Sequence, residues 1–315
     1  MRIVLTFDVE EHFRIEAAAG LGVGPAFREH CLDRVGESTR WLLDALARAE
    51  VRATFFVVGQ IAEQHPRLIR AIAAAGHEVA SHGWDHRRVL TMSPAEFRDD
   101  VRRSKEALES AGGVPVVGYR APTFSVMRRT AWALDILAEL GVEYDSSIYP
   151  VRHDRYGVPG APRTPFVARG ERETILELPP ATLRVAGVTL PMGGGGYFRL
   201  FPLWATEWAA RQTAAHCQPP LAVLYFHPWE FDPGQDRLPL RGLNRPRTYV
   251  GLGRTQGRLS KLLARHRFCR ATDVVAELNR DRDRLPVFAL SQTISDGPRV
   301  PSGDGAARLA EPTWR

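Results

Sequence analysis

The feature that most constrains the fold is a repeated alternation of short apolar segments with longer segments of helical periodicity. The apolar segments are rich in β-branched and aromatic residues, which is typical of buried strands. We expect strands at residues 2–7, 51–58, 78–80, 115–119, 142–144, 175–178 and 222–226, and helices at 34–49, 61–75, 93–112 and 128–140. Strand–helix units in series predict a mostly parallel sheet, either open or closed into a barrel.

Polar side chains with useful chemistry follow the carboxyl ends of five of these strands. In chain order they are Asp8 with Glu10, His82 with His86, Arg120, Asp145 and His227. In a β/α barrel the carboxyl ends of all strands gather on one face, where active sites are found. The expected fold is therefore α/β, a distorted (β/α) barrel of seven strands, with these side chains around one site.

Two histidines and two acids have spacings that suit one metal ion. His82 and His86 lie four residues apart, so both imidazoles can reach the same ion. Asp8 and Glu10 share one face of a strand, because residues i and i+2 point to the same side. One acid can bind the metal while the other holds or deprotonates a water. Two histidines and one carboxylate leave positions open for water and substrate, as in catalytic zinc sites.

The remaining strand ends carry groups that could support hydrolysis. The guanidinium of Arg120 can hold a carboxylate ionised and oriented. An imidazole such as His227, when a carboxylate holds it, is a good proton donor to a leaving amine, and Asp145 is a further carboxylate. Taken singly, each of these three residues is more simply explained as part of a surface ion pair or a helix cap.

Together, the five segments resemble the ordered motifs of the polysaccharide deacetylase family, which shares the NodB homology domain and forms carbohydrate esterase family four. The likeness extends from the first strand to His227. A narrower likeness links the chain to a subgroup found with bacterial exopolysaccharide and exosortase gene clusters. It is carried by residues 7–10 (FDVE), 192–199 (MGGGGYFR) and 226–233 (FHPWEFDP).

The resemblance implies a role for each motif residue. Asp8 corresponds to the general base, Arg120 to the residue that orients it and His227 to the general acid. Asp145 lies where a carboxylate would orient that acid. The metal would polarise the acetyl carbonyl and activate water, Asp8 would take a proton, and His227 would protonate the departing amine.

The resemblance also implies one divalent metal ion as cofactor, with Zn²⁺ the expected ion. His82 and His86 match the two histidine ligands. Val9 stands where the family usually has a metal-binding aspartate. Some relatives use a second acid two residues after the base, so Glu10 is the expected third ligand, and Glu11 remains a competitor.

Aromatic residues near the strand ends suit a sugar-binding groove, although core packing explains them equally well. They are Tyr149, Tyr197, Phe198 and Trp229. The glycines at 193–196 lack the Lys-Ser/Thr ending of a phosphate-binding loop, so we expect a tight turn near the pocket.

We expect the chain to divide into three parts. Residues 1–232 form the NodB-like catalytic domain, and residues 233–280 form a family-specific extension packed on the barrel. Residues 295–315 are rich in Gly, Pro, Ser and Ala without apolar periodicity, which predicts a disordered tail.

The expected location is the cytoplasm. The three cysteines are widely separated, which fits a reducing compartment. The first residues give a short apolar run followed by acids rather than a secretory signal, and no stretch is long enough to span a bilayer.

The net charge of +6 is unevenly distributed. Residues 237–284 hold 13 Lys or Arg against 4 acids, an excess of 9. A solvated surface explains this excess most simply. The alternative is peripheral contact with an anionic partner, such as the inner membrane face or a lipid-linked, pyrophosphate-bearing glycan. No nucleic-acid partner is expected.

Three functions compete at this stage. The first is a deacetylase that acts on an N-acetylated sugar in an exopolysaccharide or its lipid-linked precursor. The second is an amidohydrolase that acts on a small cyclic amide or imide, because the same fold includes such enzymes. The third is a non-catalytic glycan-binding protein. The complete set of base, metal ligands, arginine and acid argues against the third function. The segments 192–199 and 226–233, through their resemblance to the deacetylase subgroup, favour the first function over the second.

Overall fold

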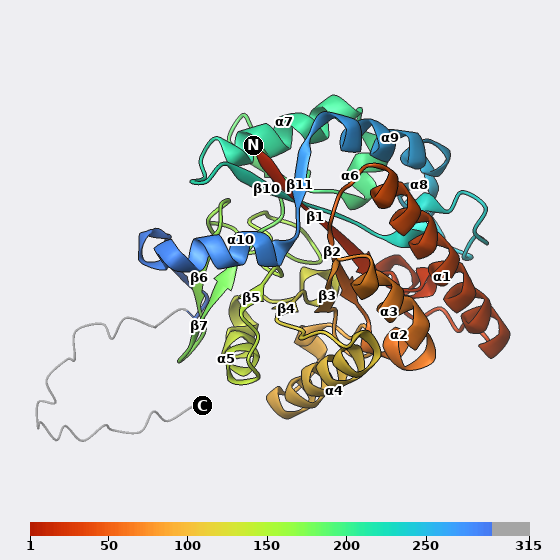
Figure 1. The fold of residues 1–315 in the computed structure, drawn as a ribbon, viewed down its shortest axis with the longest axis horizontal. Helices are drawn as coiled ribbons and strands as arrows, with labels where there is room; N and C mark the ends of the chain where they lie inside the picture. Colours follow the sequence, from red (N-terminus) through yellow and green to blue (C-terminus); the bar gives the residue numbers. More distant parts are fainter. Residues whose placement is uncertain (292–315) are drawn as a thin grey trace, which may run out of the picture.

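A curled sheet of ten strands forms the centre of the molecule, and most of the helices lie around its outside (Figure 1). The computed structural model describes residues 1–291, so the tail expected at 295–315 lies outside the described residues. Seven neighbouring strands run parallel, in the order β10-β1-β2-β3-β4-β5-β7. These are β1 (Arg2–Val9), β2 (Thr54–Val57), β3 (Glu78–Ser81), β4 (Gly118–Tyr119), β5 (Tyr144–Asp145), β7 (Thr174–Glu177) and β10 (Leu221–Phe226). They correspond to the seven strands that the sequence predicts.

Backbone contacts after β7 bring the two ends of this parallel array together. Ala181 N donates to Val223 O over 2.9 Å, and Tyr225 N donates to Gly193 O over 2.9 Å. Isolated bridges also join Pro180 to Val223 and Gly194 to Tyr225. The fold is therefore a distorted (β/α) barrel, as expected, and irregular chain rather than a regular strand completes the ring.

Five short strands were not predicted. β6 (Phe166–Arg169) pairs antiparallel with β7, and β12 (Val287–Ala289) pairs with β6. β11 (Arg267–Cys269) pairs with the first half of β1. β8 (Leu183–Val185) and β9 (Val188–Leu190) form a separate hairpin. Most are only three residues long and partly exposed, so they lack the apolar run that marks a buried strand.

The four expected helices are present with different ends, and five further α-helices after residue 194 were not predicted. The α-helices are α1 (Pro25–Arg48), α2 (Gly59–Gln64), α3 (Pro66–Ala74), α4 (Pro94–Gly112), α5 (Trp132–Glu139), α6 (Gly195–Leu200), α7 (Leu203–Ala214), α8 (Asn244–Tyr249), α9 (Leu252–Arg265) and α10 (Ala271–Leu278). The helix expected at 61–75 is two helices, because Pro66 has no N–H to continue the hydrogen-bond ladder. α4 begins where expected, with a capping box between Ser93 and Glu96.

The period-two alternation of β1 separates the outer core from the barrel interior. Ile3, Leu5 and Phe7 point outward and pack under α1, α3 and α9. Val4 points inward to a second apolar cluster, followed on the same face by Thr6 and then Asp8. The interior therefore changes from apolar to polar toward the carboxyl end of the strand.

α10 lies across the amino ends of the strands. Ala271 N donates to Oγ1 of Thr54 over 2.8 Å, and Thr272 N donates to Oε2 of Glu78 over 3.0 Å. Thr54 and Glu78 are the first residues of β2 and β3. Because α10 covers this end, the interior is accessible from the carboxyl ends of the strands.

Candidate active site

The carboxyl ends of the strands border a cavity of about 710 Å³. Its wall includes five of the predicted catalytic and metal-binding residues, namely Asp8, Glu10, His82, His86 and His227. Asp8 is the second-last residue of β1, and His82 and His227 follow directly after β3 and β10. The parallel barrel thus brings together side chains that are more than 200 residues apart in the sequence, such as those of Asp8 and His227.

Glu10, His82 and His86 form a group that could hold a metal ion. Their potential ligand atoms all lie within 4.8 Å of one another. Nδ1 of His82 is 2.7 Å from the carbonyl oxygen of Arg120. With the proton on Nδ1 for this bond, Nε2 keeps the lone pair that a metal needs. Burial lowers the pKa of His82 to about 4, so the imidazole is neutral at physiological pH.

Glu10 rather than Glu11 faces this group. Burial alone would raise the pKa of Glu10, but His86, His227 and His82 together hold it below its usual range. The Glu10 carboxylate contacts Nε2 of His86. Glu11 instead accepts hydrogen bonds from Nε and Nη2 of Arg14, at 2.5 and 3.0 Å. Glu11 therefore already has a charged partner outside the metal-binding group.

The loop that carries both histidines is held in an unusual backbone conformation. His86 has φ +66° and Gly83 has φ +73°. A left-handed conformation is uncommon for a residue with a side chain and persists where the surroundings enforce it. Oδ2 of Asp100, on α4, accepts a hydrogen bond from the backbone N–H of Trp84 over 2.8 Å. Asp100 thus positions the loop, and no motif in the sequence had indicated it.

Arg120 lies under Asp8 and orients it. Nη1 of Arg120 donates to Oδ1 of Asp8 over 2.6 Å and to Oγ1 of Thr6 over 2.7 Å. Nε and Nη2 of Arg120 donate to the carbonyl and the hydroxyl of Ser146. Arg120 is fully buried, so these bonds fix its guanidinium in a single orientation. The expected contact between Arg120 and Asp8 is therefore present, and their roles as orienting residue and base stay predictions.

His227 is held by Glu230. Oε2 of Glu230 lies 3.2 Å from Nδ1 of His227 and accepts its backbone N–H over 2.9 Å. Nε2 of His227 therefore faces the cavity, 3.7 Å from Oε1 of Glu10. The other oxygen of Glu230 contacts the guanidinium of Arg199, which lies 5.0 Å from the centre of the Trp229 ring. Burial lowers the pKa of His227.

Asp145 does not have the position expected for it. Among the described residues no hydrogen bond or ion pair joins Asp145 to His227. Asp145 accepts a hydrogen bond from the hydroxyl of Ser147 and lies beside Glu177. Burial raises the pKa of Asp145 to about 6, and raises that of Glu177 as well. The cause is topological, because β7 and the irregular chain that closes the barrel lie between β5 and β10, and Asp145 pairs with Glu177 of β7.

Two of the four predicted aromatic residues line the cavity, Tyr197 and Trp229. Phe198 is instead fully buried against Phe226, with ring centres 4.6 Å apart. Tyr149 is also fully buried, and its hydroxyl accepts a hydrogen bond from Gly193 N over 3.0 Å. The cavity wall gains three aromatic residues that the sequence did not single out, namely Phe124, Tyr156 and Tyr225.

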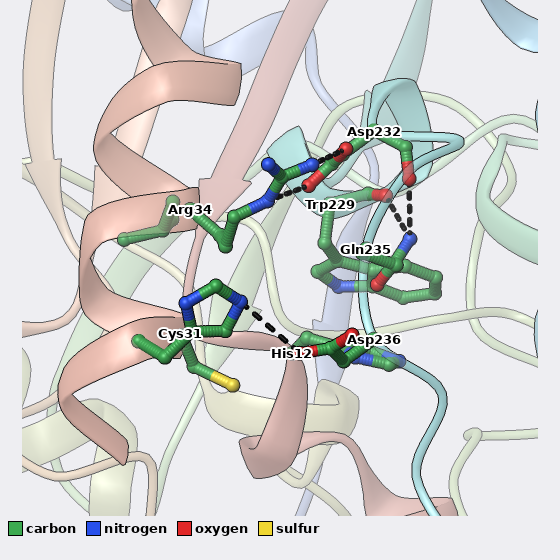
Figure 2. Close-up of a pocket in the computed structure, with 9 residues that line it drawn as sticks. His12, Cys31, Arg34, Trp229, Asp232, Gln235 and Asp236 are labelled. Atoms are coloured by element: carbon green, nitrogen blue, oxygen red, sulfur yellow. Dashed lines mark hydrogen bonds and ion pairs between the residues drawn. The ribbon is translucent and has the colours of Figure 1, made fainter. Parts of the chain in front are cut away.

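Behind Trp229, a cavity of about 10 Å³, the size of one water molecule, separates α1 from the segment after β10 (Figure 2). Nε of Arg34 donates to Oδ2 of Asp232 over 2.8 Å, and Oδ1 of Asp232 also contacts the guanidinium. Gln235 donates to the carbonyl oxygens of Trp229 and Asp232. The contact between Arg34 and Asp232 ties the segment that carries His227 and Glu230 to α1, and the bonds from Gln235 hold that segment together.

No helix within residues 1–291 combines the length and the apolar character that crossing a bilayer requires.

Comparison with known proteins gives two adjoining family matches. Residues 2–144 match the model of the polysaccharide deacetylases, and residues 146–276 match a domain of unknown function, DUF3473. The boundary between the matches lies within the barrel, because β7 and β10 belong to the second region. The division expected after residue 232 stays a prediction.

Two curated relatives are deacetylases. A chitooligosaccharide deacetylase from Bradyrhizobium sp. is 35% identical over 97 residues, which are 31% of this chain and 42% of that protein. A peptidoglycan-N-acetylglucosamine deacetylase from Listeria monocytogenes is 33% identical over 93 residues, which are 30% of this chain and 20% of that protein. The chain therefore spans less than half the length of these relatives.

Solved structures share the whole fold. A Mycobacterium smegmatis protein assigned to the polysaccharide deacetylases has a TM-score of 0.59 at 24% identity, over 90% of this chain and 92% of its own. An allantoinase has a TM-score of 0.58 at 17% identity, over 89% of this chain and 90% of its own. Residues 2–144 therefore match the polysaccharide deacetylase family, and the solved structures share the barrel fold around this region.

Proposed function

We propose that the protein is a metal-dependent hydrolase that removes N-acetyl groups from an amino sugar in an exopolysaccharide or its lipid-linked precursor. The observation that carries this proposal is the position of Glu10, His82 and His86 between two pairs of residues, one containing the proposed general base and the other the proposed general acid. Arg120 with Asp8 forms the first pair, and Glu230 with His227 forms the second. Both Asp8 and His227 line the same cavity as the metal-binding group.

The residues present fit a divalent metal ion. One carboxylate and two imidazoles are the donor set of many catalytic zinc sites, and burial keeps His82 neutral. Glu10, His82 and His86 would hold the ion, and we propose Zn²⁺. When bound, such an ion supplies Lewis acidity toward the acetyl carbonyl and lowers the pKa of water.

The protein's own groups then move the protons. Asp8, held in place by the hydrogen bond from Arg120, accepts a proton from the water that attacks the acetyl carbon. Nε2 of His227 faces the cavity and donates a proton to the sugar nitrogen as the C–N bond breaks. Acetate and the free amine leave. Tyr197 and Trp229 lie in the cavity wall where a sugar ring could stack.

The barrel itself does not separate the first two candidate functions, because an allantoinase has the same fold. Sequence favours the sugar deacetylase. Two relatives that are 33–35% identical over 93–97 residues of this chain are a chitooligosaccharide deacetylase and a peptidoglycan-N-acetylglucosamine deacetylase. The complete set of base, acid and metal ligands speaks against a purely glycan-binding protein.

Further parts of the proposal concern where the reaction takes place. We propose a cytoplasmic protein at the inner membrane face, where a lipid-linked precursor would be available. The 13 basic and 4 acidic residues within 237–284 support contact with an anionic surface or glycan.

Acetate release from N-acetylglucosamine oligomers, measured beside ring opening of small cyclic imides, tests the proposed reaction. The zinc-reconstituted protein should release acetate, and Asp8→Asn and His227→Ala should each lower kcat by at least about a hundredfold. Circular dichroism of both variants checks that they are folded. Ring opening without acetate release would contradict the proposal, and so would unchanged acetate release in folded variants.

A further inference from the structure

Exposed apolar side chains gather on one part of the surface. Of the nine large apolar side chains that are exposed within residues 1–291, six lie between residues 185 and 208. They are Val185, Val188, Leu200, Phe201, Trp204 and Trp208, and we call them the aromatic patch. Trp204 is 59% exposed and Trp208 42% exposed. Soluble surfaces rarely hold such a cluster unless it binds something.

The patch spans three neighbouring pieces of structure. Trp204 and Trp208 are one turn apart on α7, with ring centres separated by 6.4 Å. Leu200 ends α6, which packs against α7. Val185 and Val188 form the tip of the β8–β9 hairpin, and β8 packs against α7. The patch is therefore built on packed elements and not on a loose loop.

Acidic side chains are almost absent from this region. Between residues 178 and 229 the only acid is Glu207, and it is buried against Arg265 and His266, at 3.3 and 3.1 Å. Residues 237–272 contain 10 Lys or Arg and no acid. Arg258 of α9 joins the two parts, since Nη1 donates to the carbonyl of Phe201 over 2.9 Å. The aromatic patch thus lies beside a basic surface.

The patch also adjoins the catalytic cavity. Leu200 belongs to both, and the ring of Tyr197, in the cavity wall, stacks on Phe201 at 6.1 Å. Arg247 of α8 lines the same cavity, and α6 packs against α8. A molecule bound in the cavity could therefore extend directly onto the patch.

We propose that the aromatic patch and the adjoining basic helices form a docking surface for an anionic lipid bilayer. Tryptophan is the side chain most suited to the membrane–water boundary, where its ring is apolar and its N–H remains wet. Aliphatic side chains enter the acyl boundary, and nearby Arg and Lys attract anionic headgroups. Docking in this orientation places the cavity mouth at headgroup level. The docking surface does not depend on the proposed deacetylase reaction.

Other occupants fit the surface less well. A glycan could stack on the two tryptophans, but the aliphatic tip of the hairpin offers it no hydrogen bonds. A second copy of the chain would bring two basic, acid-free surfaces together, which is electrostatically unfavourable. The combination of interfacial aromatics, aliphatics and an excess of basic side chains favours the bilayer.

Vesicle flotation of the full chain tests this proposal. Wild-type protein should float with phosphatidylcholine vesicles that contain phosphatidylglycerol, and binding should weaken as salt is raised. The double variant Trp204→Gln, Trp208→Gln should bind on the order of tenfold more weakly, because two interfacial rings are lost. Val287→Gln is the matched control, since Val287 is 59% exposed on β12 outside the patch, and its binding should equal wild type.

Several results would overturn the docking surface. These are no flotation of wild type at low salt, equal flotation of the double variant, and a wild-type dimer that the double variant converts to monomer. Binding of soluble chitooligosaccharides that only the double variant loses would assign the patch to a glycan instead. Measuring acetate release from a soluble oligosaccharide beside flotation distinguishes failure of the docking proposal from failure of the proposed deacetylase reaction. Flotation without acetate release refutes the proposed reaction alone, and acetate release without flotation refutes docking alone.

Discussion

Among single residues, Glu230 sets the orientation of His227, the proposed general acid. Its carboxylate holds Nδ1 and the backbone N–H of His227, and Arg199 contacts its second oxygen. Such a carboxylate fixes the tautomer of an imidazole and favours its protonated form. Nε2 is thereby directed into the cavity.

Glu230→Gln should therefore lower kcat for acetate release by about 10- to 100-fold with little change in KM. Without the carboxylate the pKa of His227 falls, so the alkaline limb of the pH–rate profile should move to lower pH. Asp145→Asn is the matched comparison, because Asp145 has no contact with His227 among the described residues. An alkaline limb that moves in Asp145→Asn but not in Glu230→Gln would contradict this assignment.

His77 makes stability depend on pH at the opposite end of the barrel. Its Nδ1 accepts the backbone N–H of Ala53 over 3.1 Å, and burial lowers its pKa to about 4. The depressed pKa contributes stability that is present above the unfolded value of about 6.5 and is lost as pH falls through 4. This loss amounts to at most about 3 kcal/mol.

His77→Asn should reduce the pH dependence of the free energy of unfolding between pH 7 and 4, measured by denaturant titration. An amide oxygen can still accept the hydrogen bond from Ala53, and the side chain no longer titrates. His12, whose pKa burial also lowers to about 4, should leave part of the dependence in place. An unchanged pH slope in the variant would contradict the account.

The residues of the site divide into those that local sequence can indicate and those that it cannot. Asp8, His82 and His227 directly end or follow strands, so a strand pattern alone places them on one face. The partners Glu230 and Asp100 lie on a short helical turn and on α4, and only the folded geometry shows what they contact. Asp145 failed as the partner of His227 because the sequence does not say which strand ends lie across the barrel from each other.

At the scale of elements, the glycines at 193–196 allow the barrel to close. Gly194 has φ +152°, and a Cβ there would lie 1.7 Å from the carbonyl oxygen of Tyr225. The close approach permits the bridge between Gly194 and Tyr225, two residues before His227. In place of the expected tight turn, Gly194 has a backbone conformation that glycine readily adopts, and α6 begins at the next residue.

Gly194→Ala should lower the free energy of unfolding by more than about 3 kcal/mol, because the added methyl forces the two segments apart. Gly196→Ala is the matched control within the same run. Gly196 is in α6, and the nearest atom to its Cβ would be 3.7 Å away. This control should change stability by less than about 1 kcal/mol. Equal destabilisation by both substitutions in thermal or denaturant unfolding would argue against a closing role for Gly194.

The elements that sequence predicts well have a strong local signal. The parallel strands β1, β2 and β10 are largely apolar and almost fully buried, and α4 has its capping box and a terminal glycine. α1 begins at Pro25 instead of residue 34, since its first turns are largely exposed and carry little apolar periodicity. α6 and α8 are only six residues long, and their packing rather than their propensity stabilises them.

At the scale of the whole molecule, one end of the barrel is closed and the other end forms the candidate site. α10 covers the amino ends of the strands, and the carboxyl ends surround the cavity with its metal-binding group. The repeated strand–helix order was sufficient to predict this polarity. The aromatic patch could not be foreseen, because no helix was expected at residues 203–214 and only the folded structure shows that Trp204 and Trp208 are exposed.

The most direct test of the central claim is a metal titration of the chelator-treated protein, followed by acetate release from N-acetylglucosamine oligomers and by elemental analysis of bound zinc. Acetate release should be absent without metal, rise with added Zn²⁺ and level off at one ion per chain. Glu10→Gln should lower zinc affinity by at least about tenfold, whereas Glu11→Gln should bind zinc as wild type does. Acetate release that survives complete removal of metal, or zinc binding that depends on Glu11 and not on Glu10, would contradict the account.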